Sequence, residues 1–355
     1  MCVMSVTSAI IGCGGMGEWH YHQITDNIPE IQLKGVYDIR PERLEQLRGA
    51  GVPVIGSLEE VLNDPAIELV TIATPNNFHA PLAIACMEAG KNVVCEKPVT
   101  MNAAELTEVI AAAERCGKVF TVHQNRRWDA DFVTIQEIVR SNVIGKPYMI
   151  ESRVQGSRRV LCGWRGYAEN GGGMLLDWGV HLIDQLLWLV DSPVTQVYCQ
   201  MFALMPGVVV DDNMKLLMRF ENGLSALVEV STNCFILQPR WHMSCEMGTA
   251  VIDDWAVNGK MVRLTNEDEM AWEESIVYTE AGPTRTMAPR PPETTETLAL
   301  PAVKTDLRNF YRNVVKAIRE GDELIVKPAE ALRVMKVVDA CFESQRTGAA
   351  VVCRI

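Results

Sequence analysis

In the first third of the chain, short apolar runs alternate with stretches whose apolar residues recur every three to four positions. The runs predict strands and the stretches between them predict helices. Strands are expected at Val6–Ile11, Ile31–Tyr37, Glu68–Ala73, Asn92–Cys95 and Lys118–Val122, and helices at Met16–Thr25, Pro41–Arg48, Pro81–Glu88 and Ala103–Arg115. This alternation indicates an α/β fold, a doubly wound parallel sheet of the Rossmann type with helices on both faces.

After about Arg140 the predicted strands follow one another without helices between them. They are Tyr148–Val154, Val194–Phe202, Met214–Phe220, Leu224–Ser231, Trp241–Glu246 and Ala250–Asp253. Such runs predict an α+β domain with a mostly antiparallel, open-faced sheet. Thr279–Thr297, rich in Pro, Thr and Glu, predicts an exposed excursion, and two helices are expected to close the chain at Leu307–Arg319 and Ala329–Ser344.

The length of 355 residues fits two domains, at about 100–200 residues per domain. We place a cofactor-binding domain at residues 1–125 and a substrate-binding and oligomerisation domain at 126–355, whose last helices could pack back on the first domain. With 33 Lys plus Arg against 45 Asp plus Glu, the chain has a net charge of −12. An acidic chain without basic clusters argues against nucleic-acid binding.

Cysteine usage and hydropathy indicate the cellular setting. The 11 cysteines are odd in number and scattered along the chain, so we expect reduced thiols in a cytoplasmic protein. The apolar run nearest the N-terminus has no basic lead-in, and no apolar stretch is long enough to span a membrane. We therefore expect neither a signal peptide nor a membrane partner.

A glycine-rich turn follows the first predicted strand. Residues Gly12-Cys13-Gly14-Gly15-Met16-Gly17 fit the pattern G-x-G-x-x-G, and a predicted helix begins within it. This strand–turn–helix context is the one in which the pattern binds a dinucleotide. The first glycine permits the tight turn, the second lets the backbone approach the diphosphate, and the third lets helix and strand pack closely. The amides at the helix N-terminus would bind the phosphates.

An acidic residue at the end of the second predicted strand extends this assignment. Asp38 lies 38 − 17 = 21 residues after the last glycine of the turn. An acid in this place accepts hydrogen bonds from the adenosine ribose and repels a 2′-phosphate, which favours NAD over NADP. Arg40 could instead pair with that phosphate and is a further cofactor-binding candidate, although we interpret it as a solvated residue at the start of a helix.

Two further turns follow predicted parallel strands at their carboxyl ends, where ligands of open α/β sheets bind. In Glu96-Lys97-Pro98, Lys97 could donate a hydrogen bond to a substrate hydroxyl or stabilise alkoxide charge. An exposed lysine after a strand is the plainer alternative. The other turn is expected beneath the nicotinamide half of the cofactor. The candidate cofactor contacts in these two turns are Thr74, Pro75, Asn77, His79, Glu96 and Lys97.

The densest group of candidate catalytic residues follows three glycines at 171–173. Asp177, His181 and Asp184 are spaced i, i+4 and i+7, which places them on one face of a helix. A carboxylate one turn from an imidazole would orient the ring and raise its pKa, so Asp177 would prepare His181 to take the proton of an alcohol as hydride leaves the same carbon. A surface ion pair is the alternative. A metal site has less support, because no other His or Cys completes it by spacing, and we expect no metal.

Side chains for the substrate are expected at two strand ends. Asn125 and Arg126 follow the strand that ends near His123, and Arg153 and Gln155 end the first strand of the second domain. Arginine forks and aromatic faces suit the hydroxyls and rings of sugars. We assign Asn125 to the cofactor and Arg126, Arg153 and Gln155 to the substrate, together with Lys97, Asp177 and His181.

The glycine turn, Glu96-Lys97-Pro98 and the string G-G-G-x-x-x-D-x-G-x-H-x-x-D over 171–184 together resemble the family of glucose–fructose oxidoreductases, inositol dehydrogenases and rhizopine-catabolism oxidoreductases. The resemblance covers nearly the whole chain. It implies NAD(P)-dependent oxidation of a secondary hydroxyl on a sugar or cyclitol in an interdomain cleft, with Lys97, Asp177 and His181 as the catalytic set. It also implies that Trp164 and Arg165 reach the cofactor and that homodimers, homotetramers or higher homo-oligomers form through the C-terminal sheet.

Several functions remain open within this resemblance. It favours a glucose-like ring, free or in a glycoside, oxidised at the 3-hydroxyl, and inositol 2-dehydrogenase is the nearest alternative. A lyase or hydrolase that retains its NAD through the cycle would use the same residues. A nucleotide-sensing protein without activity is disfavoured by the presence of Lys97, Asp177 and His181 together.

Overall fold

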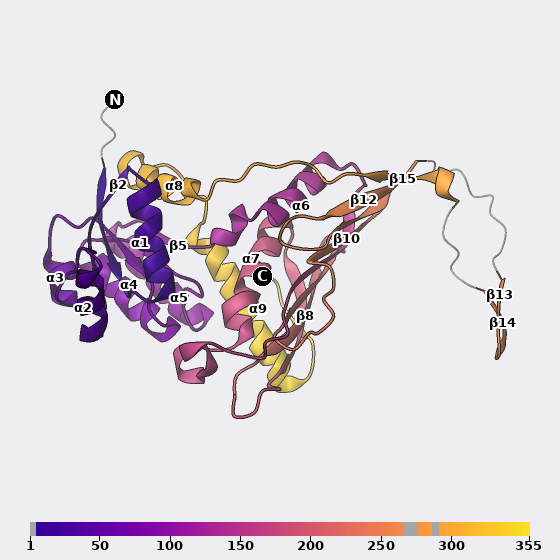
Figure 1. The fold of residues 1–355 in the computed structure, drawn as a ribbon, viewed down its shortest axis with the longest axis horizontal. Coiled ribbons are helices and arrows are strands. Elements are labelled where there is room, and N and C mark those ends of the chain that lie inside the picture. The colour runs from indigo at the N-terminus through magenta and orange to yellow at the C-terminus, as the bar shows by residue number, and fades with distance from the viewer. Residues whose placement is uncertain (1–4, 266–275, 286–290) are drawn as a thin grey trace.

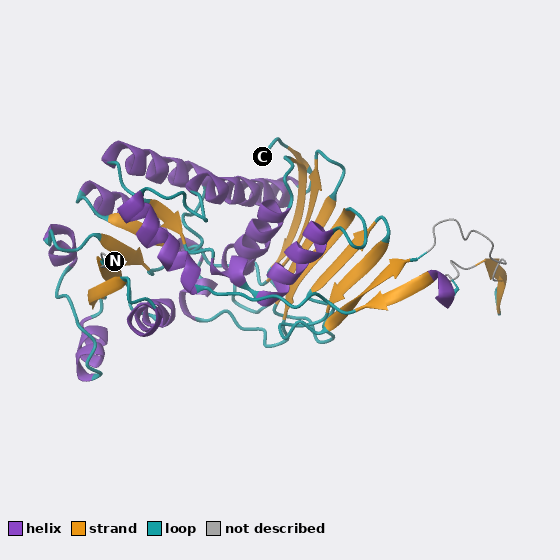
Figure 2. Ribbon diagram, turned by 90° about the horizontal axis from the view of Figure 1, so that it is seen from above, coloured by secondary structure: helices purple, strands orange, loops and turns teal. Residues whose placement is uncertain are grey.

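A computed structural model describes residues 5–265, 276–285 and 291–355 of the chain. Two sheets with their helices follow one another along the long axis of the molecule (Figures 1 and 2). The N-terminal part of the chain forms the first, and the second is a broad sheet with helices on the side that faces the first (Figure 2).

The first sheet has five strands, all parallel, in the order β2-β1-β3-β4-β5. The strands are β1 (Val6–Ile11), β2 (Ile31–Tyr37), β3 (Leu69–Ile72), β4 (Asn92–Cys95) and β5 (Phe120–Val122). The helices between them are α1 (Gly15–Asn27), α2 (Pro41–Gly49), α3 (Leu58–Asn63), α4 (His79–Glu88) and α5 (Ala103–Cys116). The predicted doubly wound sheet is confirmed; α3, with six residues, was not predicted.

The second sheet has nine strands in the order β15-β12-β11-β10-β6-β9-β8-β7-β16. They are β6 (Pro147–Gln155), β7 (Val194–Phe202), β8 (Asn213–Phe220), β9 (Ser225–Ser231), β10 (Trp241–Cys245), β11 (Gly248–Ile252), β12 (Gly259–Leu264), β15 (Thr295–Leu298) and β16 (Val351–Val352). β6 and β9 pair in parallel, and the other seven pairings are antiparallel. The predicted mostly antiparallel sheet is therefore confirmed.

The excursion predicted at Thr279–Thr297 is only partly right. β13 (Ile276–Thr279) and β14 (Gly282–Arg285) form a separate hairpin, and the side chains of β13 are exposed. At the other end of the stretch, however, β15 pairs with β12 and extends the large sheet. The residues 286–290 within this prediction lie outside the described residues.

Three helices cover one face of the large sheet: α6 (Ala130–Ser141), α7 (Val180–Leu189) and α9 (Pro328–Thr347) (Figure 2). Along β8, residues with buried side chains alternate with the exposed Lys215, Leu217 and Arg219, as expected for a sheet with one covered face. Tyr198 and Leu227 lie in register with Leu217 on this outer face. Subunit assembly through it stays a prediction.

Helix α8 (Arg308–Glu320) returns to the first sheet (Figure 1). The Tyr311 hydroxyl lies 2.7 Å from His20 Nδ1 and 3.2 Å from Thr71 Oγ1, and Arg319 forms an ion pair with Glu68 at 2.6 Å. The end of the chain thus contributes to the packing around α1 and β3. No helix in the described ranges is both long and apolar enough to cross a membrane, and the ten cysteines described there are free.

Candidate active site

The glycine turn after β1 has the geometry that its pattern predicts. Gly12 has a φ of +88°, and a Cβ there would lie 2.6 Å from the carbonyl oxygen of Ala73. A Cβ on Gly17 would lie 2.0 Å from the carbonyl oxygen of Gly12, so only glycine allows this packing. By contrast, a Cβ on Gly14 or Gly15 would meet nothing within 4 Å. The backbone at the start of α1 is therefore open to a diphosphate, and the turn fits a dinucleotide.

Asp38 and Arg40 lie together at the end of β2. Asp38 accepts hydrogen bonds from the Cys13 amide at 3.0 Å and from Arg40 Nε at 2.9 Å. Burial alone would raise the pKa of Asp38, but the hydrogen bonds from Arg40 and the Cys13 amide hold that pKa below its usual value. Asp38, whose carboxylate suits a ribose, and Arg40, whose guanidinium suits a 2′-phosphate, thus lie in contact at the same end of β2.

Lys97 and Asp177 form the central contact of the site. Lys97 Nζ donates to the Asp177 side chain at 3.0 Å and to its backbone carbonyl at 2.8 Å. Arg165 Nε lies 3.1 Å from the other carboxylate oxygen. Burial would raise the pKa of Asp177, but the two cations hold it below its usual value. A single carboxylate thus positions two cationic side chains from different parts of the chain.

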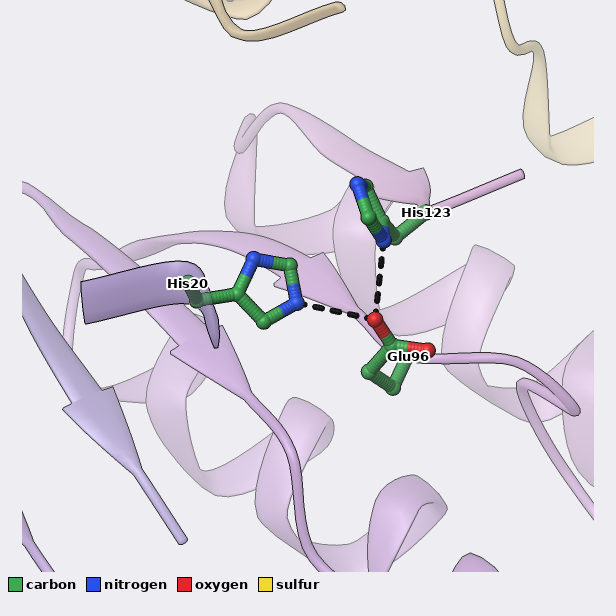
Figure 3. Close-up of side chains that lie close together, drawn as sticks. All are labelled: His20, Glu96 and His123. Atoms are coloured by element: carbon green, nitrogen blue, oxygen red, sulfur yellow. Dashed lines mark hydrogen bonds and ion pairs between the residues drawn. The ribbon is translucent and has the colours of Figure 1, made fainter. Parts of the chain in front are cut away.

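Glu96 supports Lys97 from inside the first sheet. One carboxylate oxygen lies 2.8 Å from both His20 Nε2 and His123 Nδ1, and the other accepts the Lys97 amide at 3.1 Å (Figure 3). Burial would raise the pKa of Glu96, but His123 and His20 hold it well below its usual value. The glutamate therefore ties the Lys97 turn to α1 and β5.

His20, Glu96 and His123 are also the three residues in the described part of the chain whose arrangement could hold a metal ion. All three side chains are buried. Both histidine nitrogens that face Glu96 are at hydrogen-bonding distance from it, and Tyr311 contacts the other nitrogen of His20. We therefore interpret the cluster as a hydrogen-bonded support for Lys97 and Gln124.

His181 does not interact with Asp177 as predicted. Its Nδ1 donates to Gln124 Oε1 at 3.2 Å, which leaves the lone pair on Nε2. Burial lowers the pKa of His181 well below its usual value, and the positive charges of Lys97 and Arg126 lower it further. The expectation that Asp177 raises this pKa is wrong, because the Asp177 carboxylate is held by Lys97 and Arg165. The lowered pKa favours the neutral imidazole, which is the form that can accept a proton.

Local backbone geometry explains why the helical spacing was misleading. Leu175–Gly179 forms a π-helical turn before α7, so the ordinary i, i+4 stacking does not hold there. Asp184, the third member of the predicted group, binds Arg127 through two hydrogen bonds of 2.6 and 2.7 Å inside the core. It fastens α7 to the segment that carries Asn125 and Arg126 and takes no part in the site.

The three glycines before this turn allow close approaches. A Cβ on Gly172 would lie 2.3 Å from the carbonyl oxygen of Arg165, and one on Gly173 would lie 2.1 Å from Asp211 Oδ1. Asp211 also accepts the Leu175 amide at 2.7 Å. Because they lack side chains, the glycines let this turn pack directly against Arg165 and Asp211.

A pocket of about 640 Å³ brings the three predicted catalytic residues together with six other predicted site residues. It is lined by the predicted residues Met16, Glu96, Lys97, Asn125, Arg126, Gln155, Arg165, Asp177 and His181. The guanidinium of Arg126 lies 4.2 Å from the centre of the Trp178 ring and 5.2 Å from that of Trp255. The pocket thus combines elements from both sheets, as the predicted interdomain cleft requires.

Other predicted residues lie outside this pocket. Arg153 is buried and forms ion pairs with Glu151 and Glu229, so it is not positioned to contact a substrate there. Trp164 stacks on Arg165 at 4.7 Å. The remaining turn, with Thr74, Pro75 and Asn77, lies beside the glycine turn. The buried His79 links this turn to Pro98, because its Nε2 lies 2.9 Å from the Thr74 carbonyl oxygen and its Nδ1 lies 2.8 Å from the Pro98 carbonyl oxygen.

Gln124 and Trp178 are site residues that sequence reasoning did not select. Gln124 follows β5 at the carboxyl edge of the parallel sheet, so the strand-end rule applied to Lys97 could have found it. Trp178 lies within the glycine-rich string, directly after the predicted Asp177. No local signal indicated that Trp255, from the distant loop after β11, would approach Arg126.

Two family models match the chain. Residues 6–124 match the oxidoreductase family with an NAD-binding Rossmann fold, and residues 132–251 match the GFO/IDH/MocA C-terminal domain. The chain belongs to the GFO/IDH/MocA family. It is thus an NAD(P)-binding oxidoreductase, in agreement with the geometry of the glycine turn.

Individual relatives extend the match over the full length. The chain is 41% identical to an NAD-binding protein from Listeria innocua, whose crystal structure superposes with a TM-score of 0.93 over 98% of this chain and 99% of that one. It is 28% identical to scyllo-inositol 2-dehydrogenase (NADP(+)) IolW of Bacillus subtilis, over 97% of this chain and 95% of the relative. The WlbA dehydrogenase of Bordetella pertussis, in complex with NADH and UDP-GlcNAcA, shares the fold at 21% identity, with a TM-score of 0.78 and 99% of each chain covered.

Replacing Lys97 should raise the pKa of His181. In Lys97→Met the ammonium that disfavours the imidazolium is lost, so we expect the ring to titrate at a higher pH than in the unaltered protein. An NMR titration of the His181 ring measures this shift. Lys146→Met removes an exposed lysine outside the pocket and is the matched control. An unchanged pKa in Lys97→Met would contradict the electrostatic description of the site.

Proposed function

We propose that this protein oxidises a secondary hydroxyl of a sugar, glycoside or cyclitol to a ketone with NAD as the acceptor. The observation that carries the proposal is the position of the buried His181 in one pocket with Lys97 and with Met16 at the start of α1. The lowered pKa of His181 favours its neutral form. Oxidation of an alcohol removes a proton from the oxygen and a hydride from the adjoining carbon. A base must take the proton, and a bound cofactor must take the hydride.

The roles of the residues follow from their contacts. His181 Nε2 accepts the hydroxyl proton, because Nδ1 is engaged with Gln124. Lys97 donates a hydrogen bond to the same oxygen and stabilises its developing negative charge. Asp177 positions Lys97 and Arg165 and takes no proton, because its own pKa is held low. The glycine turn and Met16 at the start of α1 would hold the NAD, which when bound would supply the acceptor for the hydride of the carbon that bears this hydroxyl.

The ring that reacts is a second level of the proposal. Relatives named as a scyllo-inositol 2-dehydrogenase and a myo-inositol 2-dehydrogenase, each 28% identical, support a cyclitol. A relative named as a D-apiose dehydrogenase, 25% identical, supports a sugar. We retain a glucose-type ring oxidised at the 3-hydroxyl as the first candidate and an inositol as the second. An enzyme that retains its NAD through the cycle is distinguished by turnover without net NADH.

Removal of either catalytic group should nearly abolish the reaction. His181→Ala and Lys97→Ala are each expected to lower kcat by about 10²- to 10⁴-fold, as is typical for a general base or a charge-stabilising donor. NADH formation over a panel of inositols, free aldoses and glucosides measures both the effect and the substrate. His22→Ala, an exposed histidine on α1, is the control and should keep full activity. Near-normal rates in both site variants would refute the assignment.

For the cofactor, we propose a preference for NAD set by Asp38. The carboxylate already accepts the Cys13 amide at 3.0 Å, so it is fixed at the end of the turn where the adenosine ribose would lie. Arg40 is more exposed than Asp38 and folds onto it, which leaves its guanidinium less available to a 2′-phosphate. The relative IolW is named for NADP(+), so the choice needs a direct test.

Two substitutions separate the contributions of these residues to cofactor choice. Asp38→Ala should lower kcat/KM for NAD by about 10- to 100-fold, the usual effect of losing charge-assisted hydrogen bonds. Arg40→Ala should change the value for NAD by less than about threefold, because its ion pair is partly solvent-exposed. Steady-state kinetics with both cofactors provide the comparison. A wild-type preference for NADP that disappears in Arg40→Ala would reverse the assignment.

A further inference from the structure

The pocket that contains Lys97 and His181 is positively charged, although the chain as a whole carries a net charge of −12. Five cationic and two carboxylate side chains line it, a difference of 5 − 2 = +3; they are Lys97, Arg126, Arg158, Arg159 and Arg165, and Glu96 and Asp177. A positively charged pocket in a negatively charged protein raises the local concentration of anionic ligands. The local field therefore favours an anion.

Most of these charges are already neutralised inside the site. Asp177 binds both Lys97 and Arg165, the buried Glu96 interacts with His20 and His123, and Arg126 pairs with Asp129 just outside the pocket at 2.8 Å. Over residues 5–265, 276–285 and 291–355, neither Arg158 nor Arg159 has an ion-pair partner; Arg159 reaches only the Leu204 carbonyl, at 3.4 Å. The excess positive charge lies on these two arginines.

The backbone holds these arginines on the pocket wall. The Gly156 amide donates to the Ser231 carbonyl at 2.8 Å, the Arg159 amide to the Thr232 carbonyl at 3.0 Å, and the Cys234 amide to the Gly156 carbonyl at 2.9 Å. Arg159 has a φ of +53°, in the left-handed region that residues other than glycine seldom adopt. Three backbone hydrogen bonds to the end of β9 and the residues after it thus fix the backbone that carries both arginines, and both residues line the pocket.

We propose that the substrate carries an anionic group, a carboxylate or a phosphate, that Arg158 and Arg159 bind while its reacting hydroxyl lies between Lys97 and His181. This inference rests on the proposed function and adds the substrate class, an acidic sugar or cyclitol or its phosphate ester. Guanidinium groups bind both anions through paired hydrogen bonds. The diphosphate of the cofactor has its own site at the start of α1, whereas these arginines share a wall with Gln155 and Ser231 of the second sheet.

Matched pairs of compounds test the proposal. Glucose is compared with glucuronate and glucose 6-phosphate, and myo-inositol with an inositol monophosphate, by kcat/KM and by calorimetric binding to the NADH complex. We expect the anionic compound of a pair to have the higher kcat/KM, and the pair with the larger difference to show whether a carboxylate or a phosphate is bound. In Arg158→Gln/Arg159→Gln the kcat/KM of the preferred anionic compound should fall by about 10- to 100-fold, the effect of losing charged hydrogen bonds. The neutral partner should change by less than about threefold.

Lys304→Gln/Lys316→Gln removes the same charge from exposed positions outside the pocket and should leave the preference unchanged. Equal or better use of the neutral compounds would overturn the inference while the proposed function stands. Weaker NADH binding in the arginine variant, with unchanged discrimination, would also overturn it and assign the arginines to the cofactor diphosphate. If neither these compounds nor the inositols, free aldoses and glucosides of the panel above turn over, the proposed function fails. Anion binding to the NADH complex that does not depend on Arg158 and Arg159 would overturn the inference separately.

Discussion

The contact between Lys97 and Asp177 joins the two halves of the site. Lys97 leaves the parallel sheet at the end of β4, and Asp177 lies in the π-helical turn before α7. Because the lysine also donates to the Asp177 backbone carbonyl, the contact fixes the position of the turn as well as the side chain. Arg165 approaches the same carboxylate, so the segment beside the glycines is held by it too. The shape of the pocket depends on this one carboxylate.

The electrostatics of His181 follow from this arrangement. With Asp177 satisfied by two cations, the imidazole has no anionic partner on its own helical turn and is buried beside Lys97 and Arg126. Both effects disfavour the imidazolium. The proposed reaction needs a neutral base, His181, and a cationic donor, Lys97, at the same hydroxyl. Pairing the Asp177 carboxylate with Lys97 instead of His181 favours both of these states. The chain thus has the motif residues Asp177 and His181, but Asp177 pairs with Lys97 and not with His181 as expected.

Much of the fold could be read from the sequence, because buried parallel strands are continuous apolar runs with clear ends. The predicted bounds of β1, β2, β4 and β7 agree with the structure. Helix α6 was not predicted, although Phe132, Ile135 and Ile138 recur at helical spacing and bury one face of it. Strand β15 was missed because it pairs with β12, which lies far from it in the sequence. Strand β12 was missed although it forms a hairpin with the neighbouring β11.

The site could be predicted less completely than the fold. Strand ends located Asp38 and Lys97, since the carboxyl edge of a parallel sheet follows from topology alone. The interaction of Asp177 with Lys97 across 80 residues, and of His181 with Gln124 across 57, depends on how the two sheets pack. Helical spacing suggested a different pairing because it assumes a regular helix, and residues 175–179 form a wider turn.

The pH dependence of hydride transfer in a single turnover tests the central claim that His181 acts as a neutral base. The folded-state pKa is lowered well below the usual value of about 6.5, so the rate should stay constant as the pH falls from neutral and decline only below that value. The decline should disappear in His181→Ala, whose residual rate has no imidazole to protonate. A decline centred above 6.5 that requires His181 would show a raised pKa and contradict the account.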